Sequence, residues 1–245
     1  MEWSVTRQEI VDTPLPTHKG RYGVIPHELF LNTVADKITS RGYGIIDERF
    51  LTNKDNQVLS GTYTIGGYDD IDITPSIYFV NSYNKSKIAS IRIGGMVLVC
   101  KNGMLSSRVY SRKHLGAKAY EDFSNQIDKG LDKLDEDFNN LIINKNEMKS
   151  LTINKDTIHK LVSDMFLEED LITSTQISIL KRELKYSKNF KDDTVWSFYN
   201  NVTESLKSNS ASNYNAQLSK FHAYASDYFD LTNKPNLYFK NKQLA

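Results

Sequence analysis

The spacing of apolar residues changes along the chain, and the change predicts two kinds of structure. Before residue 102, apolar and polar residues alternate in places, as in Ser90-Ile91-Arg92-Ile93, which is typical of a half-buried strand. After Gly116, apolar residues recur at steps of three and four, which is typical of amphipathic helices. We therefore expect an α+β fold, with an N-terminal helix and a sheet of antiparallel hairpins followed by a C-terminal helical region.

The first half is predicted to contain a short helix and a hairpin. Pro26 suits the first position of this helix, and Gly42 suits its end. Residues 43–50 and 58–65 flank the turn-forming cluster Asn53-Lys54-Asp55-Asn56 and are predicted to pair as a hairpin.

A second hairpin is predicted from residues 76–83, which turn at Asn84-Lys85 and return through Ile93. Gly94-Gly95 is expected to break or bulge the returning strand, and Met96 to Lys101 to continue as a further strand. Because Arg92 alternates with Ile91 and Ile93, it should point to the opposite, solvated face of the sheet.

The C-terminal half is predicted to be helical, with its apolar stripes forming a core. The pattern indicates one long helix with an acidic outer face and four shorter ones, over residues 123–142, 158–166, 177–184, 195–206 and 214–228. Asp156 is a candidate N-cap for the second of these helices.

Three regions are therefore expected. Residues 1–25 should form an extended arm, because Pro14 and Pro16 disfavour a helix there. Residues 26–118 should form the α+β sheet domain, and residues 119–245 a helical region packed on or beside the sheet.

Composition narrows the possible classes of protein. Hydrophobic residues make up 39% and charged residues 25%, which is ordinary for a globular chain. Cys100 is the single cysteine, so neither an internal disulfide nor a paired CxxC metal site is possible, and we expect it to be a buried strand residue. No apolar leader and no membrane-spanning stretch is visible, so a cytoplasmic protein without membrane contact is expected.

The distribution of charge is more informative than the net charge of +1. Between Ile73 and Tyr120 there is no Asp or Glu, whereas eight basic residues and His114 fall in this window. A surface of one sign attracts polyanions and supports contacts to phosphate groups. The tyrosines among these residues could stack on bases, as in proteins that bind single-stranded nucleic acid. The alternative is that the basic residues pair with acids of the helix that follows.

No catalytic signature is found. The chain lacks the phosphate-binding GxxxxGK[ST] loop and the HExxH, GxSxG and GxGxxG motifs, and its five histidines have no metal-ligand spacing. We therefore expect no catalytic residue, metal or cofactor. Asp69, Asp70 and Asp72, with Glu48 nearby, could hold Mg²⁺ in a nuclease, although a solvated Gly-Asp turn is the favoured interpretation.

Several motifs in a fixed order resemble those of a known family. They are Pro26-His27-Glu28-Leu29, Asn81-Ser82-Tyr83-Asn84-Lys85-Ser86, Val97-Leu98-Val99-Cys100-Lys101-Asn102-Gly103-Met104, Arg112-Lys113-His114-Leu115-Gly116 and Thr194-Val195-Trp196-Ser197-Phe198-Tyr199-Asn200-Asn201-Val202-Thr203-Glu204. Over residues 20 to 230 the chain resembles the phage- and plasmid-borne family of unknown function numbered nine hundred and thirty-two. Lys85 and Leu115 depart from it, standing where glycine-like and threonine-like residues are expected.

The resemblance implies a mobile-element protein acting in the cytoplasm of a bacterial host cell. The order of elements also resembles that of phage single-strand annealing proteins, which form rings on DNA, so a homo-oligomer is a possible assembly.

The leading hypothesis from sequence is a nucleic-acid-binding protein, with single-stranded DNA favoured, that assists recombination or replication. Seven side chains are candidates for phosphate contact: Lys85, Lys87, Arg92, Arg108, Arg112, Lys113 and Lys118. Tyr83 and Tyr110 are candidates for base stacking. The alternatives are a protein–protein module, either a virion component or an inhibitor of a host defence factor, and the Mg²⁺ nuclease.

Overall fold

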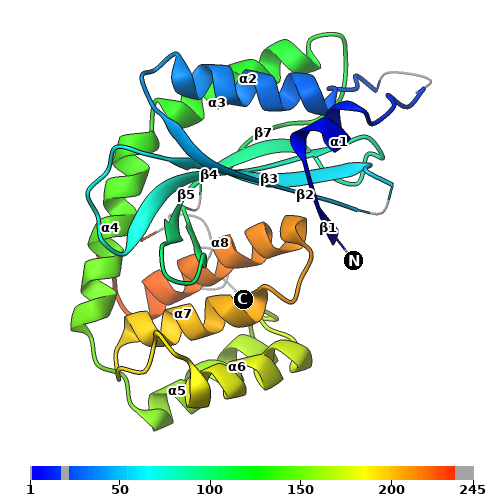
Figure 1. Cartoon of the computed structure of the whole chain (residues 1–245). Coiled ribbons are helices and arrows are strands. Elements are labelled where there is room, and N and C mark those ends of the chain that lie inside the picture. The colour runs from blue at the N-terminus through cyan, green and yellow to red at the C-terminus, as the bar shows by residue number, and fades with distance from the viewer. Residues whose placement is uncertain (1, 18–21, 54, 107, 235–245) are drawn as a thin grey trace, which may run out of the picture. The chain divides into compact units, whose positions relative to one another are not determined.

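The strands lie in the first half of the chain and most of the helices in the second, in a computed structural model that describes residues 2–17, 22–53, 55–106 and 108–234 (Figure 1). The strands are β1 (Glu2–Val5), β2 (Ile45–Asn53), β3 (Val58–Ile65), β4 (Ile73–Ser82), β5 (Ala89–Val97), β6 (Gly103–Leu105) and β7 (Tyr110–Arg112). The helices are α1 (Arg7–Val11), α2 (His27–Thr39), α3 (Ala119–Leu131), α4 (Leu134–Ser150), α5 (Lys155–Leu167), α6 (Ser174–Tyr186), α7 (Val195–Leu206) and α8 (Ala211–Tyr228).

The strands form an antiparallel sheet in the order β1-β2-β3-β4-β5-β6, with β7 also paired to β5. Both predicted hairpins are therefore present, and the α+β class with a helical C-terminal region is confirmed. In the part of the chain that the structure describes, none of the helices has the length and apolar character needed to cross a membrane.

By internal contacts the chain divides into two compact units. Unit 1 contains Met1–Asp70, Thr74–Gly94 and Arg108–Phe138, and unit 2 contains Ile71–Ile73, Gly95–Ser107 and Asn139–Ala245. The boundary that we expected after residue 118 does not coincide with this division, because α3 and the first turn of α4 belong with the sheet in unit 1.

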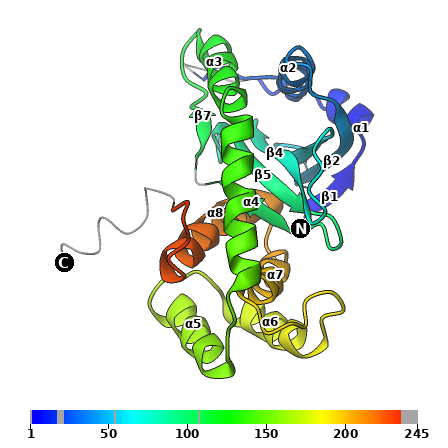
Figure 2. The same cartoon turned by 90° about the vertical axis from the view of Figure 1, so that its left-hand side faces the viewer.

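The core of unit 1 lies between the sheet and the helices α2 and α3, which lie side by side along it (Figures 1 and 2). Phe30 of α2 stacks on Phe123 of α3, with ring centroids 4.8 Å apart. Phe79 of β4 lies against Phe30 and against Tyr63 of β3, at 5.8 and 5.0 Å. This aromatic layer joins α2 and α3 to β3 and β4.

The prediction of an extended N-terminal arm is wrong, because residues 2–11 form β1 and α1. Strand β1 extends the sheet by pairing with β2, and α1 begins in a capping box in which Thr6 and Glu9 satisfy each other's backbone N–H groups. The two prolines on which the prediction rested, Pro14 and Pro16, come only after this helix has ended.

Two other predictions are corrected. The strand expected over Met96 to Lys101 ends at Val97, and Leu98 and Val99 lie in an exposed turn; Gly94-Gly95 lies inside β5. The long helix expected over residues 123–142 is two helices, α3 and α4, separated at Asp132-Lys133. Leu131 and Leu134, on either side of the break, are both buried in the core.

Unit 2 is built around α7, in which every residue except Glu204 is buried. Helices α6 and α8 pack against α7, and β6 packs against α8. The stripes that predicted α5, α6, α7 and α8 are confirmed as helical, although α5 is capped by Asn154 and not by Asp156. The Asn154 side chain accepts from the Thr157 N–H at 2.9 Å.

Candidate nucleic-acid interface

Two of the basic residues singled out in the sequence are neutralised inside unit 1. Arg108 donates to Asp137 at 2.7 Å and to Glu136 at 3.0 Å, and these hydrogen bonds raise its pKa. Arg112 of β7 pairs with Asp122 of α3 at 2.8 Å. Both arginines therefore tie the basic segment to the acidic helices that follow it, which is the alternative left open by the sequence.

Two further basic residues are half-buried. Arg92 lies on β5, and burial of its guanidinium lowers its pKa. Lys87 follows the β4–β5 turn, where its backbone exchanges hydrogen bonds with the Ser82 hydroxyl at 2.8 and 3.1 Å. Both side chains already make interactions, so neither is a freely exposed cation.

The remaining three candidates, Lys85, Lys113 and Lys118, are exposed, and we call them the lysine cluster. They surround a short bridge in which Tyr22 pairs with Leu115. Lys85 holds its ammonium 5.0 Å from the centre of the Tyr22 ring. Lys113 and Lys118 flank Leu115 along the chain. In the described part of the chain, none of the three forms an ion pair with a carboxylate.

The backbone around the bridge is closely packed. The Gly23 N–H donates to the His114 carbonyl at 3.1 Å, and a Cβ on Gly23 would lie 2.8 Å from the Gly116 carbonyl oxygen. Lys85 takes a left-handed φ of +66°, the conformation that suits the glycine expected at this position. Lys118 is the N-cap residue of α3. The three lysines are therefore attached to fixed backbone.

Neither tyrosine proposed for base stacking presents a free face. Tyr83 is only 2% exposed and stacks on His27, with ring centroids 3.8 Å apart. Its hydroxyl accepts from the His27 backbone N–H at 2.7 Å. Tyr110 is half-buried against the core of unit 1, beside Gly130 of α3. Both rings therefore contribute to the fold.

Beneath the lysine cluster lies a buried polar group that sequence reasoning missed. Asn81 donates to His27 Nδ1 at 2.9 Å and to the Ile25 carbonyl at 2.9 Å, and His27 Nε2 lies 3.0 Å from the Asn56 carbonyl. Burial lowers the pKa of His27 to about 4, so this ring is neutral at pH 7.

His114 is the unusual member of this region. It is 3% exposed, its ring lies 5.2 Å from that of Tyr22, and burial lowers its pKa. Neither of its ring nitrogens has a hydrogen-bond partner among the described residues. The Asn81 Oδ1 atom likewise has none among them. A buried imidazole without a partner retains an unused donor and an unused acceptor.

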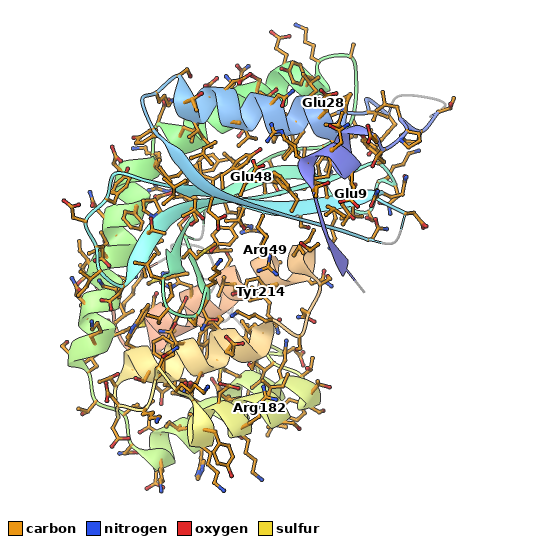
Figure 3. The ribbon with its side chains drawn as sticks, viewed as in Figure 1. Glu9, Glu28, Glu48, Arg49, Arg182 and Tyr214 are labelled. Atoms are coloured by element: carbon orange, nitrogen blue, oxygen red, sulfur yellow. The ribbon has the colours of Figure 1, made fainter. Side chains whose placement is uncertain are left out.

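The acidic residues considered for Mg²⁺ do not form a site. Asp72 pairs with Lys145 at 3.1 Å and with Lys149 at 2.9 Å, and these two lysines lower its pKa in spite of partial burial. Glu48 of β2, which is labelled in Figure 3, pairs with Arg7 at 3.1 Å. Over residues 2–234, apart from the gaps stated above, no three His, Cys, Asp or Glu side chains gather as metal ligands.

Comparison with known proteins gives one match. A family model described as domain of unknown function (DUF932) matches residues 15–224. The chain belongs to this family. No curated protein and no solved structure matches it.

The motifs behind the DUF932 resemblance converge within each unit. In unit 1, His27, Asn81, Tyr83 and His114 come from three of these motifs and form the buried group beneath the lysine cluster.

In unit 2 the other two motifs meet. Asn102 donates to the Asn200 carbonyl at 3.0 Å, and the Gly103 N–H donates at 3.0 Å to the hydroxyl of Tyr214, which is labelled in Figure 3. A cavity of about 290 Å³ lies beside Asn102, Asn200 and Glu204. Cys100 lines this cavity, and burial raises the pKa of its thiol, which disfavours the reactive thiolate.

The structure thus brings together three of the nine residues predicted from sequence, the lysines of the cluster. It adds Tyr22, Asn81 and His114, which the sequence did not single out as a group. The available signal was that His27, Asn81 and His114 all lie inside motifs that carry the family resemblance.

Proposed function

We propose that this protein binds nucleic acid through the lysine cluster of unit 1, and that it holds strands, single-stranded DNA first, during recombination or replication of a phage or plasmid. The observation that carries the proposal is the exposure of Lys85, Lys113 and Lys118 around one bridge, without a carboxylate partner in the described chain. Three ammonium groups carried by closely packed backbone attract the phosphates of a nucleic-acid backbone.

Two features beside the lysines favour an anion. Lys118 stands at the N-terminus of α3, where unpaired backbone N–H groups and the helix dipole carry partial positive charge. Of the two acidic residues in the first turn of α3, Asp122 is already paired with Arg112, whereas Glu121 is exposed. The ion pair that removes Arg112 from the interface therefore also removes a carboxylate that would repel phosphate.

Contact through the phosphates implies weak sequence preference. Base-edge contacts specify sequence, whereas phosphate contacts position the protein without reading bases. Because Tyr83 is buried and Tyr110 packs on the core, stacking on these rings is not part of the proposed interface. The proposed role is to hold strands of any sequence. The resemblance to phage- and plasmid-borne proteins supports its place in a mobile element.

A salt series tests the proposal. Binding of a labelled single-stranded oligonucleotide by the full chain is measured by fluorescence anisotropy between low and moderate salt, with a duplex of the same sequence in parallel. For three neutralised phosphates, log affinity should fall against log salt with a slope of about −2 on single strands, at roughly −0.7 per phosphate. Undetectable binding at low salt, or a slope of zero on both strand types, would overturn the proposal.

A further inference from the structure

An apolar concavity of unit 2 lies beside the last of the motifs that carry the family resemblance, and Thr194, Ser197 and Phe198 of that motif line it. It is a groove of about 880 Å³ lined by α5, α6, α7 and the loop before α7. Figures 1 and 2 show α5 and α6 side by side. The groove wall is formed by apolar side chains that are half-exposed or exposed, namely Ile158, Val162, Ile177, Leu184 and Phe190. Apolar side chains left open to water in a concave surface are typical of a binding site.

The groove is preformed, because its walls are fixed at their ends. Helix α6 begins in a capping box in which Thr173 and Gln176 satisfy each other's backbone N–H groups, and α5 is capped by Asn154. The loop before α7 is tied to the chain before α5 by a bridge between Thr152 and Thr194, and the Ile153 N–H donates to the Asp193 carbonyl at 3.0 Å. A ligand therefore pays little conformational cost for shaping the site.

Basic side chains line both long sides of this groove. On α5, Lys155 and His159 are one helical turn apart, and on α6, Lys181 and Lys185 are one turn apart. All four side chains are exposed, and in the described chain none forms an ion pair with a carboxylate. Asp192 and Asp193 also line the groove, but they belong to the loop before α7 and not to α5 or α6.

We propose that this groove binds an amphipathic helix of a partner protein, with an apolar stripe flanked on both sides by acidic residues. The apolar stripe of such a helix, repeating every three to four residues, fills the groove, and its Asp and Glu residues face Lys155 on one side and Lys181 and Lys185 on the other. A single anionic amphiphile such as a fatty acid carries one charge and needs a cation at one end only. Lysines on both sides of the groove match a helix better. The groove shares no residue with the lysine cluster, so the two proposals can be tested independently.

A displayed library of helical peptides tests the proposal directly. The library varies both flanks of an apolar stripe and is selected against the full chain, with counter-selection against the Val162→Glu variant. The expected result is enrichment of peptides with Asp or Glu on both flanks. No enrichment, or enrichment that ignores charge or favours Lys and Arg, would overturn it. A fatty-acid probe is tested alongside, and binding of that probe without any peptide binding would also overturn it.

Matched variants separate the groove from the rest of the surface. Val162→Glu places a charge in the wall and should weaken the selected peptide by at least about tenfold, or ~1.4 kcal/mol. Leu167→Glu, at an exposed α5 position outside the groove, should leave binding unchanged. The triple variant Lys155→Glu, Lys181→Glu, Lys185→Glu changes only exposed residues and keeps the apolar wall intact. It should bind peptides with basic flanks more tightly than peptides with acidic flanks. Lys160→Glu is its control. Loss of binding in both controls would contradict the assignment to this groove.

Discussion

At the scale of single residues, Tyr83 shows how a side chain that suits one role in a sequence has another in the fold. Its ring stacks on His27, its hydroxyl accepts from the His27 N–H, and burial raises its pKa. The variant Tyr83→Phe leaves that buried N–H without its acceptor, so the free energy of unfolding should fall by about 1–3 kcal/mol. Urea denaturation measures this, and affinity for single-stranded DNA should not change.

The control for Tyr83 is Tyr186→Phe, because Tyr186 is 65% exposed and its ring has only a lysine ammonium over it. This control should alter stability by no more than about 0.5 kcal/mol. If Tyr83→Phe instead weakened DNA binding at unchanged stability, the ring would have to reach the ligand, and its assignment to the core would be wrong.

Two buried histidines predict how stability depends on pH. Burial lowers the pKa of His27 and of His222 to about 4, against about 6.5 in the unfolded chain. Between these values the unfolded state binds more protons than the folded state, so stability is complete above pH 6.5 and decreases as the pH falls toward 4. Each histidine contributes up to about 3 kcal/mol to this loss.

Urea unfolding between pH 7 and pH 5 checks the histidine prediction. The midpoint should fall steadily over this range. In the His222→Gln variant the midpoint should change less with pH than in the parent chain. Carboxylates stabilised by lysines, such as Asp72 and Asp128, lose their protecting effect at lower pH, since their pKa values are lowered. A midpoint that is constant from pH 7 to pH 5 would show that both imidazoles bind protons in the folded protein as they do in the unfolded chain.

The sequence predicted which basic residues are exposed better than it predicted which of them form ion pairs. Lys85, Lys113 and Lys118 were identified because the window around them lacks acids. The pairing of Arg108 with Asp137 and of Arg112 with Asp122 was foreseen only as an alternative, because it depends on how α3 and α4 pack against β7. Burial of His114 and Asn81 depends on the meeting of distant segments, which no local pattern encodes.

At the scale of elements, Gly130 tests how closely α3 packs against the sheet. A Cβ at this position would lie 2.9 Å from Ile91 Cδ1 and 3.0 Å from Tyr110 Cδ2. Alanine is the better helix former by about 1 kcal/mol, yet crowding in a packed core costs about 1–3 kcal/mol. Gly130→Ala should therefore lower the free energy of unfolding, or leave it unimproved.

The matched control for Gly130 is Gly44→Ala, at a position where a Cβ would have no atom within 4 Å. Thermal and urea unfolding of both variants, compared with the parent chain, give the result. A gain in stability for Gly130→Ala of the size expected from helix propensity would show that α3 stands away from β5 and β7.

The apolar periodicity predicted which helices and strands exist, whereas the positions at which they begin and end depend on tertiary contacts. The helices α2, α5, α6, α7 and α8 and both hairpins carry clear apolar patterns, and all were predicted. Strand β1 has only four residues and exists because it pairs with β2, and the turn at Leu98 interrupts an apolar run that looks like a strand. The break between α3 and α4 keeps the helical spacing of buried leucines, so the spacing alone concealed it.

At the scale of the whole molecule, the chain carries two separate proposed binding surfaces. Unit 1 has a lysine cluster over buried polar groups, and unit 2 has an apolar groove with lysines on both sides. A protein that holds nucleic acid by one unit and a partner helix by the other would act as an adaptor. Because the two surfaces share no residue, substitutions in one should leave the other's affinity unchanged.

The most direct test of the central claim compares two triple variants in a salt series on single-stranded DNA. Lys85→Ala, Lys113→Ala, Lys118→Ala removes the lysine cluster, and Lys129→Ala, Lys155→Ala, Lys160→Ala removes three exposed lysines elsewhere. The cluster variant should lose roughly 0.7 of slope per lysine, about 2 in all, while the control keeps the parental slope. Equal slopes in the two variants would contradict the assignment of phosphate binding to this cluster.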